Sequence, residues 1–489
     1  MRLTILVLLF LGGPHASAQA MVRYSVAPAS TDASGVSRVL RVSLYLPVDA
    51  LAAPVMLIMP RAIPMGYGQQ PYDQFVTVTA ARSRSGAAAT VRREDGPRWS
   101  ITSSAPEEPI AAIDYEVDLV AMENGILSGG DSSRVREGFI SVLGYSVFAY
   151  VEGLEDHAIE LSVSAPAAHP AWPVFSTLAP VAPAATGPLV ARATNFYELA
   201  DSQILMGPAF RVSRIRSSPD LFLAIHTEGA ADEEVMAPLA RQAFDAVIGY
   251  FGTTPFPHFT LVFDYLKPIS PRHTYGFSME HMQSATFGAL ATAAPTAQST
   301  ERERAGFRYN VAHHVSHAWI PKRCAGLGYF PFRWELAPLI ETIWLSEGFG
   351  QYAAADALSD VLPQSRDGRT YRETLVEARF QNTLRDMPDF LKRMPLVDLS
   401  RTASTMYSED FRTGRTVFSR GGLMANEMDQ RIKAATGGQK RLRDALRALV
   451  AWSAREKRPF RIEELPGIFK IATGVETRDV MDRWLAGMP

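Results

Sequence analysis

A cluster of histidines constrains the fold of this 489-residue chain more than any other feature. His313, His314 and His317 are three of its ten histidines and fall within five residues. The pattern from Arg302 to Trp319 predicts a helix, on which residues four positions apart lie on one face. His313 and His317 can therefore bind one metal ion together. The fold must then supply a further ligand from another element.

Glu347 is the candidate for this third ligand. It lies in the run WLSEGF, within a helix that the sequence predicts over residues 338–359. Two histidines and one carboxylate leave the fourth position to water, which is the open coordination of a catalytic zinc. A lone H-x-x-x-H pair is weak evidence, because surface histidines also cluster by chance. The hypothesis of one zinc ion per chain therefore rests on how far other segments agree with it.

The order of strand and helix patterns predicts a multidomain protein. From residue 22 to 165 apolar and polar residues alternate, as at Val42 and Leu44, with Gly, Pro and Asp between the runs. We expect an all-β, sandwich-like N-terminal domain over residues 21–189, ending in an Ala/Pro-rich linker. An α+β domain at 190–370 and a mainly helical part at 371–489 follow. Long helices are predicted near residues 232–250, 301–319, 338–359, 371–385, 420–436, 439–454 and 462–486.

The first twenty residues and the overall composition indicate where the protein is found. Residues 1–20 have a charged Arg2, a short apolar run and small residues near Ala18, which is typical of a secretory signal peptide. We expect an exported protein, periplasmic or extracellular, with no membrane span. The net charge of −2 gives no basic field for nucleic acid. Cys324 is the single cysteine, so no internal disulfide is expected.

Several segments resemble the glycyl aminopeptidase family of gluzincin zinc metallopeptidases. HHVSHAWIPKR from His313 is similar to the family's H-E-x-x-H-x-W-x-x-K-R, and WLSEGF is similar to its second metal-binding segment. The family's C-terminal helices are resembled by Arg420-Gly421-Gly422-Leu423, by Asp429 to Ile432 and by Thr436-Gly437-Gly438. The resemblance implies a thermolysin-like catalytic domain with zinc on His313, His317 and Glu347. Many relatives carry a C-terminal PDZ domain, which we do not expect here.

A second resemblance concerns substrate. The run YGFSMEH, from Tyr275 to His281, is similar to the family's G-G-x-E-H loop. In related aminopeptidases the glutamate of that loop binds the free α-amine, so the resemblance implies this role for Glu280, with Gly276 and His281 beside the substrate. The expected partners are peptide or protein N-termini. The alternative for His281 is that it only packs beside the loop.

The chain departs from the family at the residue that follows the first histidine. The family has a glutamate there, which takes a proton from the zinc-bound water, and this chain has His314. Three interpretations compete: the site binds metal but hydrolysis is impaired, His314 is itself the base, or His314 is a further ligand that closes the site. We favour the first, and rate the third lowest because the next residue along a helix points about 100° away.

A second departure lies before the Arg420-Gly421-Gly422 segment. Family members carry a tyrosine there that can stabilise the oxyanion, and this chain has Val417-Phe418. Tyr407 is the candidate substitute. The sequence therefore predicts an exported zinc metallopeptidase-like protein of aminopeptidase type with impaired catalysis. The alternatives are a non-catalytic peptide-binding protein that uses the same cleft, and a protein in which zinc only stabilises the fold.

Overall fold

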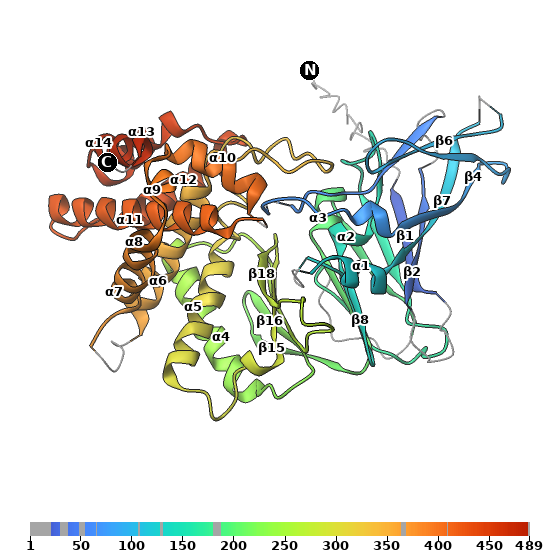
Figure 1. Ribbon diagram of the computed structural model, residues 1–489, viewed down its shortest axis with the longest axis horizontal. Coiled ribbons are helices and arrows are strands. Elements are labelled where there is room, and N and C mark those ends of the chain that lie inside the picture. The colour runs from blue at the N-terminus through green and yellow to red at the C-terminus, as the bar shows by residue number, and fades with distance from the viewer. Residues whose placement is uncertain are drawn as a thin grey trace, which may run out of the picture.

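The computed structural model describes residues 21–29, 38–47, 54–64, 66–105, 108–127, 131–178, 187–362, 368–407 and 409–487. The predicted signal peptide and part of the Ala/Pro-rich linker, residues 179–186, lie outside these ranges. Two parts are seen side by side in Figure 1, a β-rich half on the right and a C-terminal half on the left. No helix among the described residues is long and apolar enough to cross a membrane.

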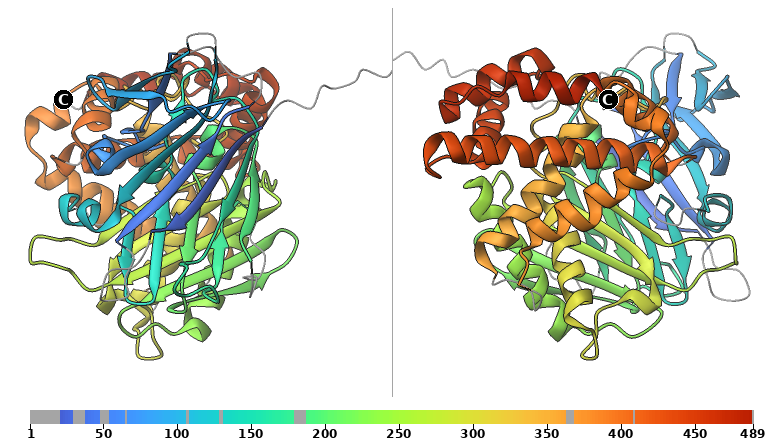
Figure 2. Two further views of the ribbon diagram at one scale, coloured as in Figure 1. Left: turned by 90° about the vertical axis from the view of Figure 1, so that its right-hand side faces the viewer. Right: turned by 60° about the vertical axis from the view of Figure 1, so that its left-hand side comes forward.

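The β-rich half, residues 22–206, is built from three sheets. Alternating burial along its strands follows the sequence pattern, since Leu40, Val42 and Leu44 are buried and the residues between them are not. The largest sheet has the order β13 (Leu189–Ala193), β11 (Ile159–Val163), β1 (Val22–Pro28), β2 (Val39–Tyr45), β7 (Ile110–Asp118) and β4 (Val76–Ser83). Its strands face the viewer in the left view of Figure 2.

Two smaller sheets complete this half. One has the order β10 (Tyr150–Val151), β3 (Val55–Ile58), β6 (Arg98–Thr102) and β5 (Thr90–Arg93). The other has the order β12 (Val174–Ser176), β14 (Gln203–Met206), β9 (Phe139–Leu143) and β8 (Arg134–Arg136). Short helices join the strands: η1 (Tyr72–Phe75), α1 (Leu119–Gly125), α2 (Gly144–Val147) and α3 (Phe196–Ala200). The apolar core of this half also includes Met279 and Trp334 from the C-terminal half, so the two halves share packing.

The C-terminal half begins with a five-stranded sheet of order β15 (Phe210–Arg216), β16 (Asp220–Thr227), β17 (His258–Leu266), β19 (Ser284–Leu290) and β18 (Gly276–Glu280). The helices α4 (Glu233–Phe251) and α5 (Glu301–Ser316) pack together beside it. Asp232 caps α4, and Thr300 with Glu303 forms a capping box at the start of α5. A short turn, η2 (Ala291–Ala293), precedes α5. These capping residues fix where the two helices begin, including α5, which carries the histidines.

The remaining helices form the mainly helical part. They are η3 (Trp344–Phe349), α6 (Gly350–Val361), α7 (Tyr371–Thr374), η4 (Leu375–Gln381), α8 (Asn382–Asp386), α9 (Asp389–Arg393), α10 (Leu396–Met406), α11 (Phe411–Thr436), α12 (Leu442–Glu456), η5 (Ile462–Glu464), α13 (Leu465–Thr473) and α14 (Arg478–Ala486). The right view of Figure 2 shows the long α11 crossing this part of the molecule. The helical core extends from here to the sheet, because one apolar cluster contains Leu221 and Met481.

Three predicted helix boundaries differ from the structure. The helix expected to reach Trp319 ends at Ser316, because Pro321 disfavours helical geometry at the residue before it. The helix expected from residue 338 begins only near Ile343, with η3 as its first turns. The helix expected from residue 420 begins at Phe411, where the side chain of Asp410 caps it. The two glycines at 421 and 422 lie in its interior.

Candidate metal centre

The helix α5 brings His313 and His317 to the same face. Their Nε2 atoms are 3.4 Å apart. Oε2 of Glu347 lies 3.3 Å from Nε2 of His313, and Oε1 lies 3.7 Å from Nε2 of His317. A tetrahedral zinc with ligand bonds of about 2.0–2.1 Å requires donor atoms about 3.3 Å apart. The three predicted ligands therefore fit one zinc ion.

Glu347 is held in place by an unusually close contact between two helices. It lies in the π-helical turn η3, and such turns are frequent at functional sites. A Cβ atom on Gly421 would meet the carbonyl of Trp344, and one on Gly348 would meet the backbone of Gly421. Only glycine lets α11 approach η3 this closely, so the backbone next to Glu347 rests directly on another backbone.

Hydrogen bonds fix the orientation of two of the three candidate ligands. Nδ1 of His317 donates to the carbonyl of Ile320 at 2.9 Å, which leaves Nε2 free to bind metal. The hydroxyl of Tyr67 donates to Oε1 of Glu347 at 3.0 Å. Nδ1 of His313 has no hydrogen-bond partner among the described residues. Burial, with the nearby imidazoles of His317 and His314, lowers the pKa of His313 well below its usual value, which keeps the ring neutral and able to bind metal.

Glu280 and His314 complete a cluster of five buried side chains. Glu280 ends β18, and its Oε2 lies 3.6 Å from Nδ1 of His314, too far for a hydrogen bond. Donor atoms of His313, His314 and His317 all lie within 4.8 Å of one another, as do those of Glu280, His317 and Glu347. His314 thus lies closer to the predicted ligands than its position on the helix suggested.

The charge state of this pair follows from its surroundings. Burial lowers the pKa of His314, and the carboxylate of Glu280 raises it by less. Burial raises the pKa of Glu280, but the imidazoles of His317 and His314 outweigh it, and the pKa lies below its usual value. Glu280 is therefore an ionised carboxylate inside the protein, which suits a cation as its partner.

Two residues that the resemblance placed beside the substrate lie elsewhere. Nδ1 of His281 pairs with Asp201 at 3.1 Å and Nε2 pairs with Thr286 at 3.0 Å, so both ring nitrogens are used within the buried core. The packing alternative for His281 is the one that its contacts support. Gly276 begins β18, four residues before Glu280 and about 13 Å away at a rise of about 3.3 Å per residue.

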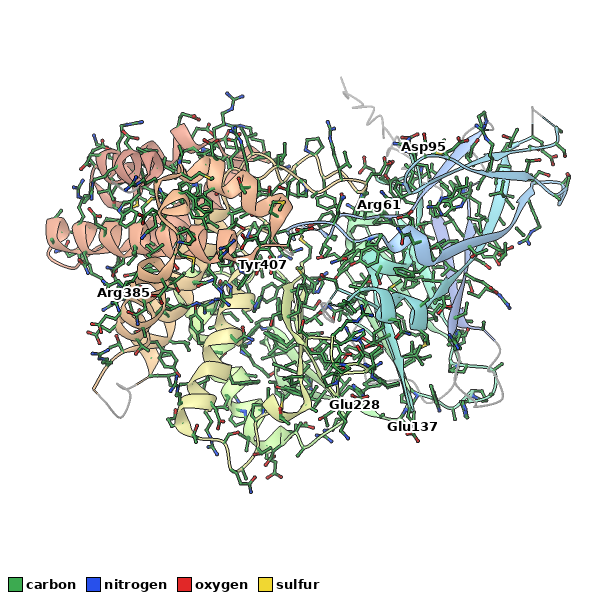
Figure 3. All side chains as sticks on the ribbon, in the orientation of Figure 1. Arg61, Asp95, Glu137, Glu228, Arg385 and Tyr407 are labelled. Carbon is green, nitrogen blue, oxygen red and sulfur yellow. The ribbon has the colours of Figure 1, made fainter. Side chains whose placement is uncertain are left out.

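Tyr407 lies at the edge of the site. It follows the last residue of α10, and Figure 3 shows it where the helical part faces β18. Its ring lies 5.6 Å from that of Tyr67 and 6.1 Å from that of Phe418, the residue at the family's tyrosine position. Burial, followed by the charges of Glu347 and Glu280, raises the pKa of Tyr407. Its hydroxyl is thus a neutral donor near the predicted ligands.

No sequence pattern predicts that Tyr67 belongs to this site. This residue belongs to the β-rich half, in a loop between β3 and η1, and nothing in the local pattern marks it. Its contact with Glu347 spans 280 positions of the chain. Proximity of that kind is visible only in the folded molecule.

Comparisons with known proteins agree with this fold. Residues 31–208 match the peptidase M61 N-terminal domain. A search of curated proteins finds no match. An aminopeptidase N family protein from Idiomarina loihiensis has a TM-score of 0.82 at 18% identity, over 96% of this chain and 76% of that chain.

Two further structures have similar folds. An M1 zinc metallopeptidase from Deinococcus radiodurans has a TM-score of 0.54 at 14% identity, over 96% of this chain and 95% of that chain. A point mutant of that enzyme, bound to a Tyr-Ser-Ala substrate, has a TM-score of 0.53 at 14% identity over the same shares. The predicted fold class and the predicted resemblance to zinc metallopeptidases are confirmed.

Proposed function

We propose that this protein binds one zinc ion at His313, His317 and Glu347 and takes up the free N-termini of peptides, with impaired hydrolysis. The observation that carries the metal site is the separation of the three donor pairs, 3.3, 3.4 and 3.7 Å. When bound, zinc supplies Lewis-acid polarisation of a carbonyl and a water of lowered pKa. The fold shared with zinc metallopeptidases supports this chemistry.

Glu280 is the proposed anchor for the substrate's α-amine. It is a buried, ionised carboxylate at the end of β18, close to His317 and Glu347. An ammonium group there gains a charge-assisted interaction in a site that excludes water. This assignment makes peptides with a free N-terminus the preferred partners.

Impaired hydrolysis follows from His314. Its Nδ1 faces Glu280 at 3.6 Å, so an imidazole occupies the position of the family's general base, beside the proposed amine anchor. Loss of a general base typically reduces the rate by about 10²- to 10⁴-fold. Phe418, which has no hydroxyl, removes a second group that the family uses. A non-catalytic peptide-binding protein is therefore the second candidate, and export through residues 1–20 remains part of the proposal.

The test compares the wild type with the His314→Glu variant. Bound zinc is measured on both purified proteins, and hydrolysis of aminoacyl amides is assayed. We expect about one zinc per chain in each, and at least 10²-fold faster hydrolysis in the variant. Wild-type hydrolysis close to that of the variant contradicts impairment. Zinc missing from both, after expression with ample metal, contradicts the ligand assignment. A variant that binds zinc and peptide but stays inactive favours the non-catalytic candidate.

A further inference from the structure

The metal centre receives one group from the β-rich half. The hydroxyl of Tyr67 donates to Oε1 of Glu347 at 3.0 Å. The other carboxylate oxygen, Oε2, is the one closest to His313. The phenol thus contacts the oxygen that lies 3.7 Å from Nε2 of His317, and the other oxygen faces His313.

The segment that carries Tyr67 is attached to the C-terminal half by the two residues that follow Tyr67. We call residues 66–70 the Tyr67 segment. The amide of Gly68 donates to the carbonyl of Ser404 at 2.8 Å, and the amide of Ala337 donates to Oε1 of Gln69 at 3.3 Å. Figure 3 labels Arg61, which lies on the chain that runs from the β-rich half toward Tyr407. The amide of Gln70 donates to the carbonyl of Arg61, which closes the loop on itself.

Tyr67 is suited to donate and not to accept. Its hydroxyl lies 3.0 Å from a carboxylate oxygen of Glu347, which accepts the hydrogen bond. The nearby hydroxyl of Ser346 is a weaker partner, because its Oγ lies 3.4 Å from the Tyr67 oxygen and only 2.7 Å from that of Tyr329. The carboxylate of Glu347 is thus the principal acceptor for the Tyr67 proton.

Steric fit leaves little freedom for the Tyr67 segment. A Cβ on Gly66 would lie 2.9 Å from Cγ2 of Ile63 and 3.1 Å from Cε of Met279, and Met279 is the residue before Glu280. The ring of Tyr67 also packs 5.6 Å from that of Tyr407. The hydroxyl is therefore held against Glu347 by contacts with both halves.

We propose that Tyr67 is a positioning residue of the metal centre, whose hydrogen bond to Oε1 fixes how the Glu347 carboxylate faces His313 and His317. Zinc retention then depends on the docking of the β-rich half, since this half supplies the hydroxyl. The inference rests on the proposed function, because Glu347 must be a metal ligand. Outer partners of ligating carboxylates typically change metal affinity by about 10- to 100-fold.

The test removes single hydroxyl groups from the full-length protein. Tyr67→Phe loses the contact with Glu347, and Tyr329→Phe is the matched control, because its hydroxyl bonds Ser346 and has no hydrogen bond with Glu347. Zinc affinity is measured by competition with a chelator, and the Co²⁺-loaded proteins are compared by absorption spectroscopy. We expect zinc affinity to fall about 10- to 100-fold in Tyr67→Phe, with a changed cobalt spectrum, and neither effect in Tyr329→Phe.

Each other outcome counts against the inference in a different way. Wild-type affinity in Tyr67→Phe overturns it while leaving the ligand assignment intact. An equal loss in both variants also overturns it, because the effect then belongs to the hydroxyl group around Ser346. A lower unfolding temperature of metal-free Tyr67→Phe with an unchanged cobalt spectrum assigns Tyr67 a purely structural role. A wild type that takes up no zinc overturns the proposed function and this inference together.

Discussion

Nδ1 of His314 and Oε2 of Glu280 face each other at 3.6 Å inside the protein. In a related enzyme with glutamate at the first of these positions, two carboxylates would share this space, and a metal ion would be needed to offset their repulsion. The imidazole removes that repulsion, because a neutral or positive ring is compatible with an ionised carboxylate. The residue to which the proposed function assigns impaired hydrolysis therefore also avoids charge repulsion in the metal-free protein.

The first prediction follows from this contact. The His314→Glu variant buries a carboxylate beside Glu280 and Glu347, so its metal-free form unfolds at a lower temperature than the wild type. Added zinc offsets the repulsion, and we expect a larger zinc-induced rise in unfolding temperature for the variant. Calorimetry with and without zinc measures both. The neutral His314→Gln variant is the control, and a rise in this control as large as that in His314→Glu argues against the charge explanation.

Removal of a ligand gives the second prediction. Glu347→Gln replaces a carboxylate by a neutral amide, and we expect zinc affinity to fall by more than the roughly 10- to 100-fold typical of outer partners. Glu341→Gln is the matched control, because Glu341 pairs with Arg401 at 2.6 Å and such exposed pairs contribute about 0–1 kcal/mol. Metal analysis after dialysis against a chelator distinguishes them. Equal zinc in both variants would exclude Glu347 as a ligand.

A third prediction concerns the amine anchor. Glu280→Gln removes the charge that an α-ammonium meets, and charge-assisted hydrogen bonds contribute about 1.5–3 kcal/mol. The preference of the wild type for a free tripeptide amide over its N-acetyl form should fall by about 10- to 100-fold in the variant. Titration calorimetry of both peptides against both zinc-loaded proteins measures the preference. A wild type that binds the two peptides equally well shows that Glu280 is not an amine anchor.

The fourth prediction tests the contact between η3 and α11. In Gly421→Ala the new methyl group meets the carbonyl of Trp344, which cannot move without displacing η3, so we expect a loss of about 3 kcal/mol or more in stability. Gly306→Ala, at an open position of α5, should instead stabilise by about 1 kcal/mol. Urea unfolding of the two variants gives both values. Near-neutral behaviour of Gly421→Ala would mean that the helices separate easily.

Local spacing was enough to predict that the three candidate metal ligands lie together. His313 and His317 lie on one helical face, and Glu347 lies in a segment of distinctive sequence, so the structure brings the three side chains together as expected. His281 was misassigned because its partners, Asp201 and Thr286, come from other elements of the fold. The role of Tyr67 could not be predicted, because it is a loop residue 280 positions from its acceptor and belongs to no periodic sequence pattern. The start of α11 was not predicted because Thr413, Gly414 and Thr416, in its first turns, are poor helix formers.

The packing of Gly348 and Gly421 shows that residues of a sequence motif can serve the fold rather than the reaction. These glycines are part of the very segments that identify the chain as metallopeptidase-like, and their role is to let two backbones touch. Selection for a folded protein alone would preserve them, whether or not a peptide bond is ever cleaved. A sequence motif can therefore persist after the reaction is lost. In a chain with His314 and Phe418, the motif is evidence of common ancestry rather than of catalytic turnover.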